Sequence, residues 1–239
     1  MRRSWYRFCQ TLCQLALIWP VRLRVFGLRY VPRSGGALLV ANHQSFFDPV
    51  LSAVALPREV SFMARDTLFG SGLFTRLIVS LNAFPVKRGS ADLSAMKEAL
   101  RRLRSGAALT VFPEGTRTPD GSIQAMQAGV MLLARRSNVP LVPTLILGAF
   151  EAWPRKRKFP LPGPILVAYA PPLTPQKYAG LDDESCMRIV RGRIVDLARR
   201  YREHPHVRRV ISSRVRRQDS ASPSLENSPA AVHANFTAG

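Results

Sequence analysis

The chain has 239 residues, of which 46% are apolar, and its 35 Lys and Arg against 15 Asp and Glu give a formal charge of +20. That length fits one large α/β domain with accessory ends, and the apolar share is enough for a sizeable core. Three cysteines are too few for a disulfide framework or a four-cysteine metal site and indicate a reducing compartment. The positive charge implies an anionic partner, namely nucleic acid, an anionic membrane surface or a phosphorylated substrate.

Residues 1–20 combine basic side chains with Trp5, Tyr6, Phe8 and Trp19. Proline and arginine interrupt the apolar stretch that follows, so it is too short to span a bilayer. No small-residue cleavage site of a signal peptide comes after it. The composition predicts an amphipathic helix lying in the membrane interface. A helix packed against the domain is the alternative.

From residue 21 onward, apolar runs typical of strands alternate with segments of helical spacing. This alternation predicts an α/β fold, with a mixed, mostly parallel sheet flanked by helices in a single domain. Asp92 is expected to cap a helix whose apolar face carries Leu93, Met96, Leu100 and Leu103. The predicted strands are 21–31, 37–41, 60–64, 83–89, 107–112, 141–147 and 165–170, and the predicted helices are 48–56, 68–81, 92–104, 122–136 and 182–201.

The composition changes after about Tyr201. Several arginines come first, and residues 220–239 are then rich in Ser, Ala, Pro and Asn. This predicts a disordered tail whose basic half either contacts anionic lipid or is simply solvated. The expected organisation is therefore a membrane-interface helix at 1–20, a central domain at 21–203 and a basic, then Ser/Pro/Ala-rich tail at 204–239.

The first candidate site is Asn-His-Gln-Ser-Phe-Phe-Asp at residues 42–48, between a predicted strand and a predicted helix. His43 can take a proton from a hydroxyl near neutral pH. In a tight turn, Asp48 would accept the other ring N–H and stabilise the imidazolium, as the acid does in a Ser-His-Asp triad. Unless Ser45 serves, this segment holds no nucleophile, so we expect the substrate to bring its own hydroxyl. The alternative is a capped turn, with Asp48 before Pro49 at a helix N-terminus.

The second candidate site is Phe-Pro-Glu-Gly-Thr-Arg at residues 112–117, which also follows a predicted buried strand. Gly115 lets the backbone approach a ligand closely, and Arg117 can hold a phosphate through its planar fork of donors. Glu114 could hydrogen-bond a substrate hydroxyl or hold Arg117 in place. The alternative is a turn with an ordinary Glu–Arg pair.

Lys87 and Arg88 end the predicted strand 83–89. They could complete a clamp for a phosphate, and solvated charge at a strand end is the alternative. Val139–Pro143 opens another strand, where its prolines shape an edge or an entry loop and its residues are expected to pack rather than react.

These segments together resemble the blocks of a known family, the glycerolipid acyltransferases of the 1-acyl-sn-glycerol-3-phosphate acyltransferase type. The matching segments are 42–48, 84–88, 112–117 and 139–143, in the family's order and spacing. The resemblance covers about residues 21–172. It implies an α/β sheet of the glycerol-3-phosphate acyltransferase type, with an N-terminal two-helix membrane-docking element.

The resemblance also implies transfer of an acyl chain from acyl-CoA or acyl-carrier protein to the free hydroxyl of lysophosphatidic acid, which gives phosphatidic acid. His43 would be the general base and Asp48 its orienting partner, and no covalent acyl-enzyme, metal or bound cofactor is expected. By the same resemblance, the residues that bind the glycerol phosphate are Arg88, Glu114, Gly115, Thr116 and Arg117, and the supporting residues are Asn42, Ser45, Lys87 and Gln127.

The sequence departs from the family after the third block. Members often carry a lysine there in a Phe-Lys-x-Gly pattern, whereas this chain has Met-Gln-Ala-Gly at 126–129. Gln127 keeps hydrogen-bonding capacity and loses the charge, which leaves the acceptor's head group open. Glycerol 3-phosphate, another lysophospholipid and an aminolipid are the alternative acceptors.

An anionic membrane surface is the expected partner, at the cytoplasmic face of the inner membrane, with peripheral or monotopic attachment. The basic run 155–158, between Trp153 and Phe159, suits a membrane-surface or CoA-phosphate contact, and a solvated loop is its alternative. A non-catalytic basic module that binds membrane or nucleic acid is the rival from another class. The sequence opposes nucleic acid, because it shows no aromatic-interleaved RNA platform and no zinc-ligand spacing.

Overall fold

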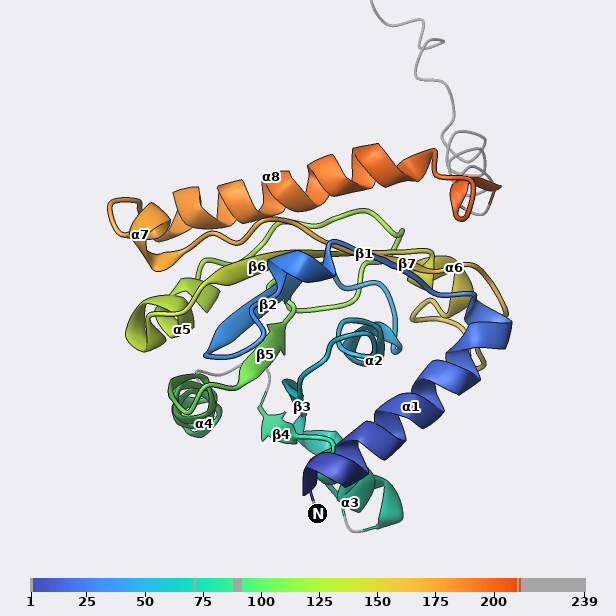
Figure 1. The fold of residues 1–239 in the computed structure, drawn as a ribbon, viewed down its shortest axis with the longest axis horizontal. Coiled ribbons are helices and arrows are strands. Elements are labelled where there is room, and N and C mark those ends of the chain that lie inside the picture. Colours follow the sequence, from blue (N-terminus) through green and yellow to red (C-terminus); the bar gives the residue numbers. More distant parts are fainter. Residues whose placement is uncertain (1, 71, 88–91, 210, 212–239) are drawn as a thin grey trace, which may run out of the picture.

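The computed structural model describes residues 2–70, 72–87, 92–209 and 211. Seven strands form one sheet in the order β1-β7-β6-β2-β5-β3-β4, in which β6 and β7 are antiparallel and every other pair is parallel. The predicted α/β class with a mixed, mostly parallel sheet is confirmed (Figure 1). The strands are β1 (Arg24–Phe26), β2 (Ala37–Ala41), β3 (Val60–Arg65), β4 (Ala83–Val86), β5 (Ala108–Val111), β6 (Leu141–Leu147) and β7 (Leu166–Tyr169).

Helices cover both faces of this sheet, which is why its central strand β2 is apolar at every position. In β2, Leu38 and Val40 face the core shared with α4, α5 and α8, whereas Leu39 and Ala41 face the core under α2. Figure 1 shows α8 on one side of the sheet and α1 and α2 on the other. The helices are α1 (Arg2–Val21), α2 (Asp48–Leu51), α3 (Leu73–Ser80), α4 (Leu93–Arg104), α5 (Val130–Ser137), α6 (Ala149–Ala152), α7 (Pro175–Tyr178) and α8 (Asp183–Arg202), with 3₁₀ turns at Leu28–Tyr30 and Asp66–Leu68.

Several predicted boundaries are confirmed. Strand 141–147 is found as predicted. Asp92 caps α4, where its Oδ1 accepts from the backbone N–H groups of Ser94 and Ala95 at 3.1 and 3.0 Å. Asp182 caps α8 by accepting from the backbone N–H of Ser185 at 2.8 Å. Short polar side chains thus begin both long helices of the domain, as helix capping requires.

Other predicted elements are wrong in extent. The helix predicted from Ser122 begins only at Val130, because the backbone N–H of Gln127 donates to the carbonyl of Pro113 at 3.0 Å and holds the preceding segment extended along the loop after β5. The strand predicted over 21–31 shrinks to β1, because Gly27 turns the chain with φ of +73°. A Cβ at Gly27 would lie 2.2 Å from the carbonyl oxygen of Tyr169, so the close approach also requires glycine.

Two predicted helices are shorter, and one predicted helix face is shifted. The helix expected over 48–56 ends at Leu51 and gives way to turns, and the one expected over 68–81 reduces to α3 after a 3₁₀ turn. On α4, Leu93 is 70% exposed, whereas Ala95 and Ala99 are buried with Leu100 and Leu103. The helix approaches the sheet along the two small alanines, which turns Leu93 outward.

Helix α1 packs on the domain, which was the alternative weighed for the N-terminus, and its place in a membrane interface stays a prediction. One face packs on the domain, because Tyr6 and Cys9 are buried and the Gln10 amide donates to the carbonyls of Ala53, Val54 and Leu56. The opposite face exposes apolar side chains. These are Trp5, Phe8, Leu12 and Leu15.

The expected two-helix N-terminal element is wrong, because among the described residues α1 alone precedes β1. The helix beside α1 is α3, which comes later in the chain, and Trp5 Nε1 donates to Ser80 Oγ at 2.9 Å (Figure 1). Within the described part of the chain, no helix has the length and apolarity needed to cross a membrane. The division at residues 20 and 203 stays a prediction, and the predicted disordered tail at 220–239 lies outside the described residues.

Candidate active site

The topology brings the two candidate segments together. Strands β6, β2 and β5 are neighbours and parallel, so the loops that follow them meet at one edge of the sheet. Residues 42–47 follow β2, residues 112–118 follow β5, and α6 with Trp153 follows β6. The carboxyl edge of a parallel sheet is the usual position of a site in α/β proteins.

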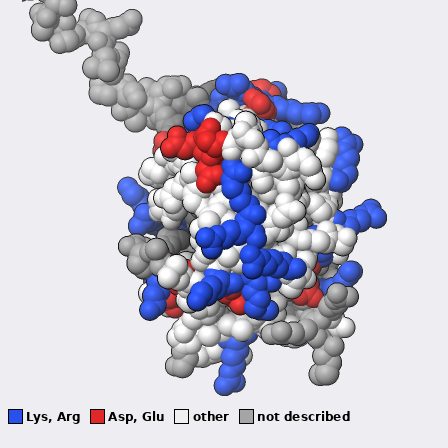
Figure 2. Space-filling view, turned by 90° about the vertical axis from the view of Figure 1, so that its left-hand side faces the viewer, with Lys and Arg blue, Asp and Glu red and all other residues white. Residues whose placement is uncertain are grey.

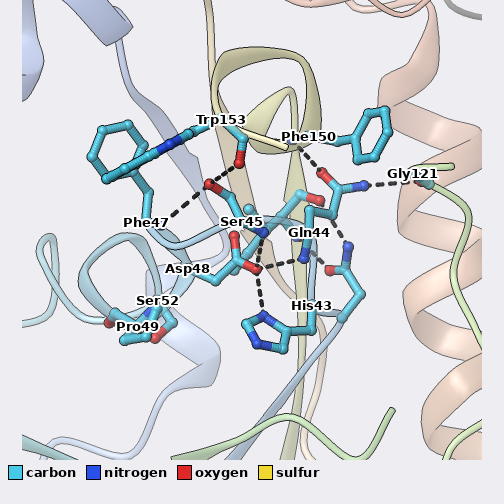
Figure 3. A network of polar contacts seen from close by, with 12 residues as sticks. His43, Gln44, Ser45, Phe47, Asp48, Pro49, Ser52, Gly121, Phe150 and Trp153 are labelled. Atoms are coloured by element: carbon cyan, nitrogen blue, oxygen red, sulfur yellow. Dashed lines mark hydrogen bonds and ion pairs between the residues drawn. The ribbon is translucent and has the colours of Figure 1, made fainter. Parts of the chain in front are cut away.

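The predicted pair of His43 and Asp48 is formed. His43 Nδ1 lies 2.8 Å from Asp48 Oδ2, and Asp48 is fully buried (Figure 3). The same carboxylate oxygen accepts from the backbone N–H groups of Gln44 and Ser45 at 2.5 and 2.7 Å. Asp48 therefore braces the ring and closes the turn around it.

This contact orients the imidazole. Burial raises the pKa of the Asp48 carboxyl, and the His43 ring and the two backbone N–H groups oppose that rise. With Nδ1–H donating to the carboxylate, the neutral ring keeps Nε2 as its free acceptor, a tautomer assigned from the hydrogen bond. The ring lies against Phe112, with centroids 4.3 Å apart and planes 22° from parallel. Phe112 therefore limits where the ring can turn.

The side chains of Asn42 and Ser45 tie the loop after β2 to two other segments, strand β6 and the turn after α6. The Asn42 side chain continues the pairing with β6, since it donates to the carbonyl of Ile146 at 3.0 Å and accepts from the N–H of Ile146 at 2.8 Å. Ser45 Oγ donates to the carbonyl of Trp153 at 2.9 Å and accepts from the N–H of Phe47 at 3.2 Å (Figure 3). The predicted supporting residues Asn42 and Ser45 thus fix the loop, and the buried Ser45 hydroxyl is engaged in two hydrogen bonds.

The loop after β5 carries Glu114, Gly115, Thr116 and Arg117. Glu114 is buried, and neither of its carboxylate oxygens has a hydrogen-bond partner of good geometry. Burial raises the pKa of Glu114 to about 7, the charge of Asp48 adds to the rise, and the nearby backbone N–H groups of His43 and Gln124 oppose it. The ordinary hydrogen-bonded pair of Glu114 with Arg117 is therefore not formed.

The other residues of this loop lie at its surface or against aromatic side chains. Gly115 has φ of +73°, which favours glycine, and Thr116 is exposed. The Arg117 guanidinium lies 3.5 Å above the ring of Phe46, which joins the two loops through a cation–π contact. Arg117 is thereby held near the His43 segment.

The two remaining predicted supporting residues are Gln127 and Lys87, and they differ in their distance from the loop after β5. Gln127 lies beside the loop after β5, because its Nε2 would be 3.1 Å from a Cβ built on Gly115. Lys87 directly follows β4, and β3 separates β4 from β5. At strand spacings of about 4.8 Å, the two strand ends are roughly 10 Å apart, so Lys87 does not adjoin the Glu114 loop directly. Arg88 lies outside the described residues.

Several residues of the site are not singled out by the sequence. The backbone N–H of Thr118 donates to the carbonyl of His43 at 2.8 Å and joins the two loops. The Gln44 side chain donates to the carbonyl of Gly121 at 3.0 Å. Trp153 packs on Phe46 and Phe47, with centroid distances of 5.0 and 4.8 Å. No local sequence pattern predicts these contacts, because the partners come from distant segments. The aromatic pair Phe46 and Phe47 beside Ser45 is the only local feature that indicates one of them.

Among the described residues, no group of three or more His, Cys, Asp or Glu side chains is arranged to hold a metal ion. The site therefore offers one imidazole, one orienting carboxylate, one guanidinium and one buried carboxylate without a hydrogen-bond partner of good geometry. This set can move a proton at a hydroxyl and hold an anionic group beside it.

Comparison with known proteins places the matching region over these loops. A family model described as Acyltransferase matches residues 22–147. The 1-acyl-sn-glycerol-3-phosphate acyltransferase of Bacillus subtilis is 26% identical over 144 residues, which cover 60% of this chain and 71% of that protein. The chloroplastic enzyme LPAT1 of Arabidopsis thaliana, also named 1-acyl-sn-glycerol-3-phosphate acyltransferase, is 27% identical over 157 residues, which cover 64% of this chain and 44% of that protein. The chain thus spans less than half of the plant relative.

Two further comparisons are with a mouse protein and with a crystal structure. The 1-acyl-sn-glycerol-3-phosphate acyltransferase alpha of Mus musculus is 30% identical over 175 residues, which cover 70% of this chain and 61% of that protein. A crystal structure of the acyltransferase PlsC from Thermotoga maritima superimposes with a TM-score of 0.75 at 24% identity, covering 85% of this chain and 82% of that one. That likeness confirms the predicted type of fold.

Proposed function

The chain belongs to the Acyltransferase family, and we propose that it acylates the free hydroxyl of lysophosphatidic acid with a fatty acyl group from a thioester donor, giving phosphatidic acid. The observation that carries the proposal is the His43–Asp48 pair, 2.8 Å apart, at the sheet edge where the loop after β5 presents Glu114 and Arg117. The names of the relatives support lysophosphatidic acid as the acceptor.

In the proposed reaction, His43 Nε2 takes the proton from the acceptor hydroxyl as its oxygen attacks the thioester carbonyl. Asp48 stabilises the imidazolium, which then gives its proton to the leaving thiolate. The new ester bond forms as the carbon–sulfur bond breaks, so the proton and both fragments are accounted for. General-base catalysis of this kind contributes roughly 10²–10⁴-fold, and holding the two substrates together supplies much of the rest.

The acceptor phosphate is assigned to the loop after β5. Arg117 supplies a planar fork of donors, and its stacking on Phe46 fixes the plane of that fork beside the His43 segment. The exposed Thr116 hydroxyl provides a further donor. Glu114 is placed to hydrogen-bond an acceptor hydroxyl, which would supply the partner that its buried carboxylate lacks. From the sequence, Arg88 is assigned to the acceptor phosphate and Lys87 to a supporting role.

We assign no covalent acyl-enzyme to this site. The Ser45 hydroxyl donates to the carbonyl of Trp153 and accepts from the N–H of Phe47, so it is not aimed at a substrate. Direct transfer therefore needs only an activated acceptor hydroxyl and a donor of acyl-CoA or acyl-carrier protein. No bound cofactor enters this scheme.

Peripheral attachment to an anionic membrane completes the proposal. The outward faces of α1 and α3 expose Trp5, Phe8, Leu73 and Phe74, and Leu73 is 83% exposed. Aromatic and aliphatic side chains on two adjacent helices suit the acyl boundary of a bilayer, and the formal charge of +20 favours anionic lipid. We assign this surface to the cytoplasmic leaflet.

The test is mass spectrometry of the lipids that purified protein makes from acyl-CoA and lysophosphatidic acid. We expect phosphatidic acid, with a loss of about 10³-fold or more for His43→Ala. Glycerol 3-phosphate, other lysophospholipids and an aminolipid, offered in parallel, check the acceptor. His204→Ala is the matched control, because His204 packs against Tyr201 near the end of α8. Unchanged turnover for His43→Ala would refute the assignment.

A further inference from the structure

A second cavity lies at the amino ends of the strands, on the edge opposite the candidate active site. Its volume is about 650 Å³, within the range of small-ligand pockets. Its walls come from the loop before β2, the start of β3, the segment between α4 and β5, and the inner face of α1. Five arginines line it, namely Arg7, Arg33, Arg58, Arg101 and Arg102.

Acidic side chains offset only part of this charge. Glu98 pairs with both Arg101 and Arg102, and Glu59 Oε2 accepts from the Asn82 amide. Five guanidinium groups therefore face two carboxylates among the described residues around the cavity. Figure 2 shows Lys and Arg gathered in a band on the side of the molecule where α4 and α5 lie.

Arg58 lines this cavity, and carbonyl groups hold its guanidinium in place. Its guanidinium donates to the carbonyls of Pro32, Gly35 and Gly106, each at 2.7 Å. It is half-buried, no carboxylate of the described residues pairs with it, and burial lowers its pKa. Carbonyl dipoles orient this cation without neutralising it, so a positive centre remains inside the cavity.

Arg7 and Arg33 differ from the three other arginines because they are exposed at the cavity and no hydrogen bond or ion pair is formed by either among the described residues. Their side chains can therefore close on a ligand at no cost in existing contacts. Arginine forks bind phosphate oxygens in pairs. The cavity thus combines a fixed cation with two adaptable ones.

The source of the phosphate follows from the neighbouring surface. Tyr6, Arg7 and Gln10 of α1 and Val79 of α3 line the cavity. The outward faces of the same two helices carry the exposed apolar side chains, where Trp5 stacks on Phe8 at 5.8 Å between centroids. One molecule with a phosphate head and acyl chains would satisfy both surfaces.

We propose that this cavity binds the phosphate head group of an anionic phospholipid at a site separate from the active site. It would anchor the protein through Arg7 and Arg33 while α1 and α3 contact the acyl region. The inference stands on the cavity and on the exposed faces of α1 and α3, and it does not depend on the proposed acyl transfer.

The test compares two double variants of the full chain. The first combines Arg7→Ala and Arg33→Ala, and the second combines Arg199→Ala and Arg200→Ala. The second pair removes the same charge from exposed positions on α8. Co-sedimentation is measured with phosphatidylcholine vesicles containing or lacking phosphatidate, and circular dichroism verifies folding. We expect the first pair to weaken binding to phosphatidate vesicles about thirtyfold, from roughly 1 kcal/mol for each basic side chain at the surface, and the control pair to change it less than about twofold.

Two further measurements distinguish a lipid phosphate from a soluble one, and the cavity from the active site. Calorimetric titration with glycerol 3-phosphate is expected to give equal affinities for both double variants, and their rates of acyl transfer in detergent are expected to match that of the parent protein. Equal vesicle binding by the two double variants would overturn the proposal. Loss of glycerol 3-phosphate binding alone in the first pair would replace the lipid by a soluble phosphoester.

Discussion

The loop after β2 and the loop after β5 lie at the same edge of the sheet and differ in how their polar groups are satisfied. In the first, Asp48 Oδ2 accepts three hydrogen bonds although the buried Oδ1 accepts none, the Asn42 amide pairs with Ile146, and the Ser45 hydroxyl is engaged twice. In the second, the buried Glu114 carboxylate has no hydrogen-bond partner of good geometry. We infer that the first loop is preorganised for proton transfer, whereas the second awaits an acceptor.

The difference also has an energetic side. Preorganised groups need not move during the reaction, and their hydrogen bonds stabilise the fold at the same time. A buried carboxylate without a partner lowers the stability of the folded state until a ligand or a proton satisfies it. The two loops should therefore respond differently to substitution.

The largest effect tests the preorganised loop. Asp48→Asn replaces the acceptor of the Nδ1–H bond by an amide, which favours the wrong tautomer of His43, and we expect kcat to fall about 10³-fold. Steady-state kinetics measure this, and thermal unfolding checks that the buried substitution leaves a folded protein. Asp196→Asn, on the exposed face of α8, is the control. A kcat within tenfold of the parent enzyme would remove Asp48 from the mechanism.

The next largest effect tests the loop after β5. Arg117→Ala removes the guanidinium assigned to the acceptor phosphate, and we expect KM for lysophosphatidic acid to rise about 10–100-fold while kcat changes little. Arg117→Lys should recover only part of this, because lysine keeps the charge and loses the fork. An acceptor without phosphate, monoacylglycerol, should be used equally by both proteins. A fall in kcat with unchanged KM would contradict a role in ground-state binding.

Much of the fold could be predicted from local patterns. The buried strand 37–41 is specified by its apolar run, and the cap Asp92 by a short polar side chain at a helix start. The 122–129 segment was predicted wrongly as helix, because its conformation depends on a bond to the carbonyl of Pro113. Contacts between segments distant in sequence override local propensity there.

The candidate site likewise contains contacts that the local sequence predicts and contacts that depend on distant segments. His43 with Asp48 is a local pair within one turn, so its spacing in the sequence predicts it. Thr118 and Trp153 reach the same loop from the ends of β5 and β6, and that meeting depends on strand order. Strand order is a property of the whole sheet and is not written in any one segment.

A smaller effect concerns the pH dependence of stability. The folded pKa of Glu114, about 7, is above its ordinary value of 4.5, so the folded state binds more protons between those pH values, and stability is lost as pH rises through that window. Glu114→Gln removes this loss. Between pH 4.5 and pH 7, we expect the free energy of unfolding of the variant to rise relative to that of the parent by up to about 2 kcal/mol. Above pH 7, the difference between the two proteins should stay constant. Urea unfolding across this range measures it, and a constant difference between the two proteins would show that Glu114 does not titrate there.

The smallest effect separates direct transfer from an acyl-enzyme. Ser45→Ala removes the hydroxyl that donates to the carbonyl of Trp153 and accepts from the N–H of Phe47, so we expect a loss of about 1–2 kcal/mol in stability and less than about tenfold in kcat. Urea unfolding and steady-state kinetics measure the two quantities, with Ser122→Ala as a control on an exposed loop. If Ser45 were a nucleophile, the variant would lose as much activity as His43→Ala, and the parent enzyme would show a burst of thiol release before steady state. Because the hydroxyl is buried and committed to two backbone groups, we expect neither.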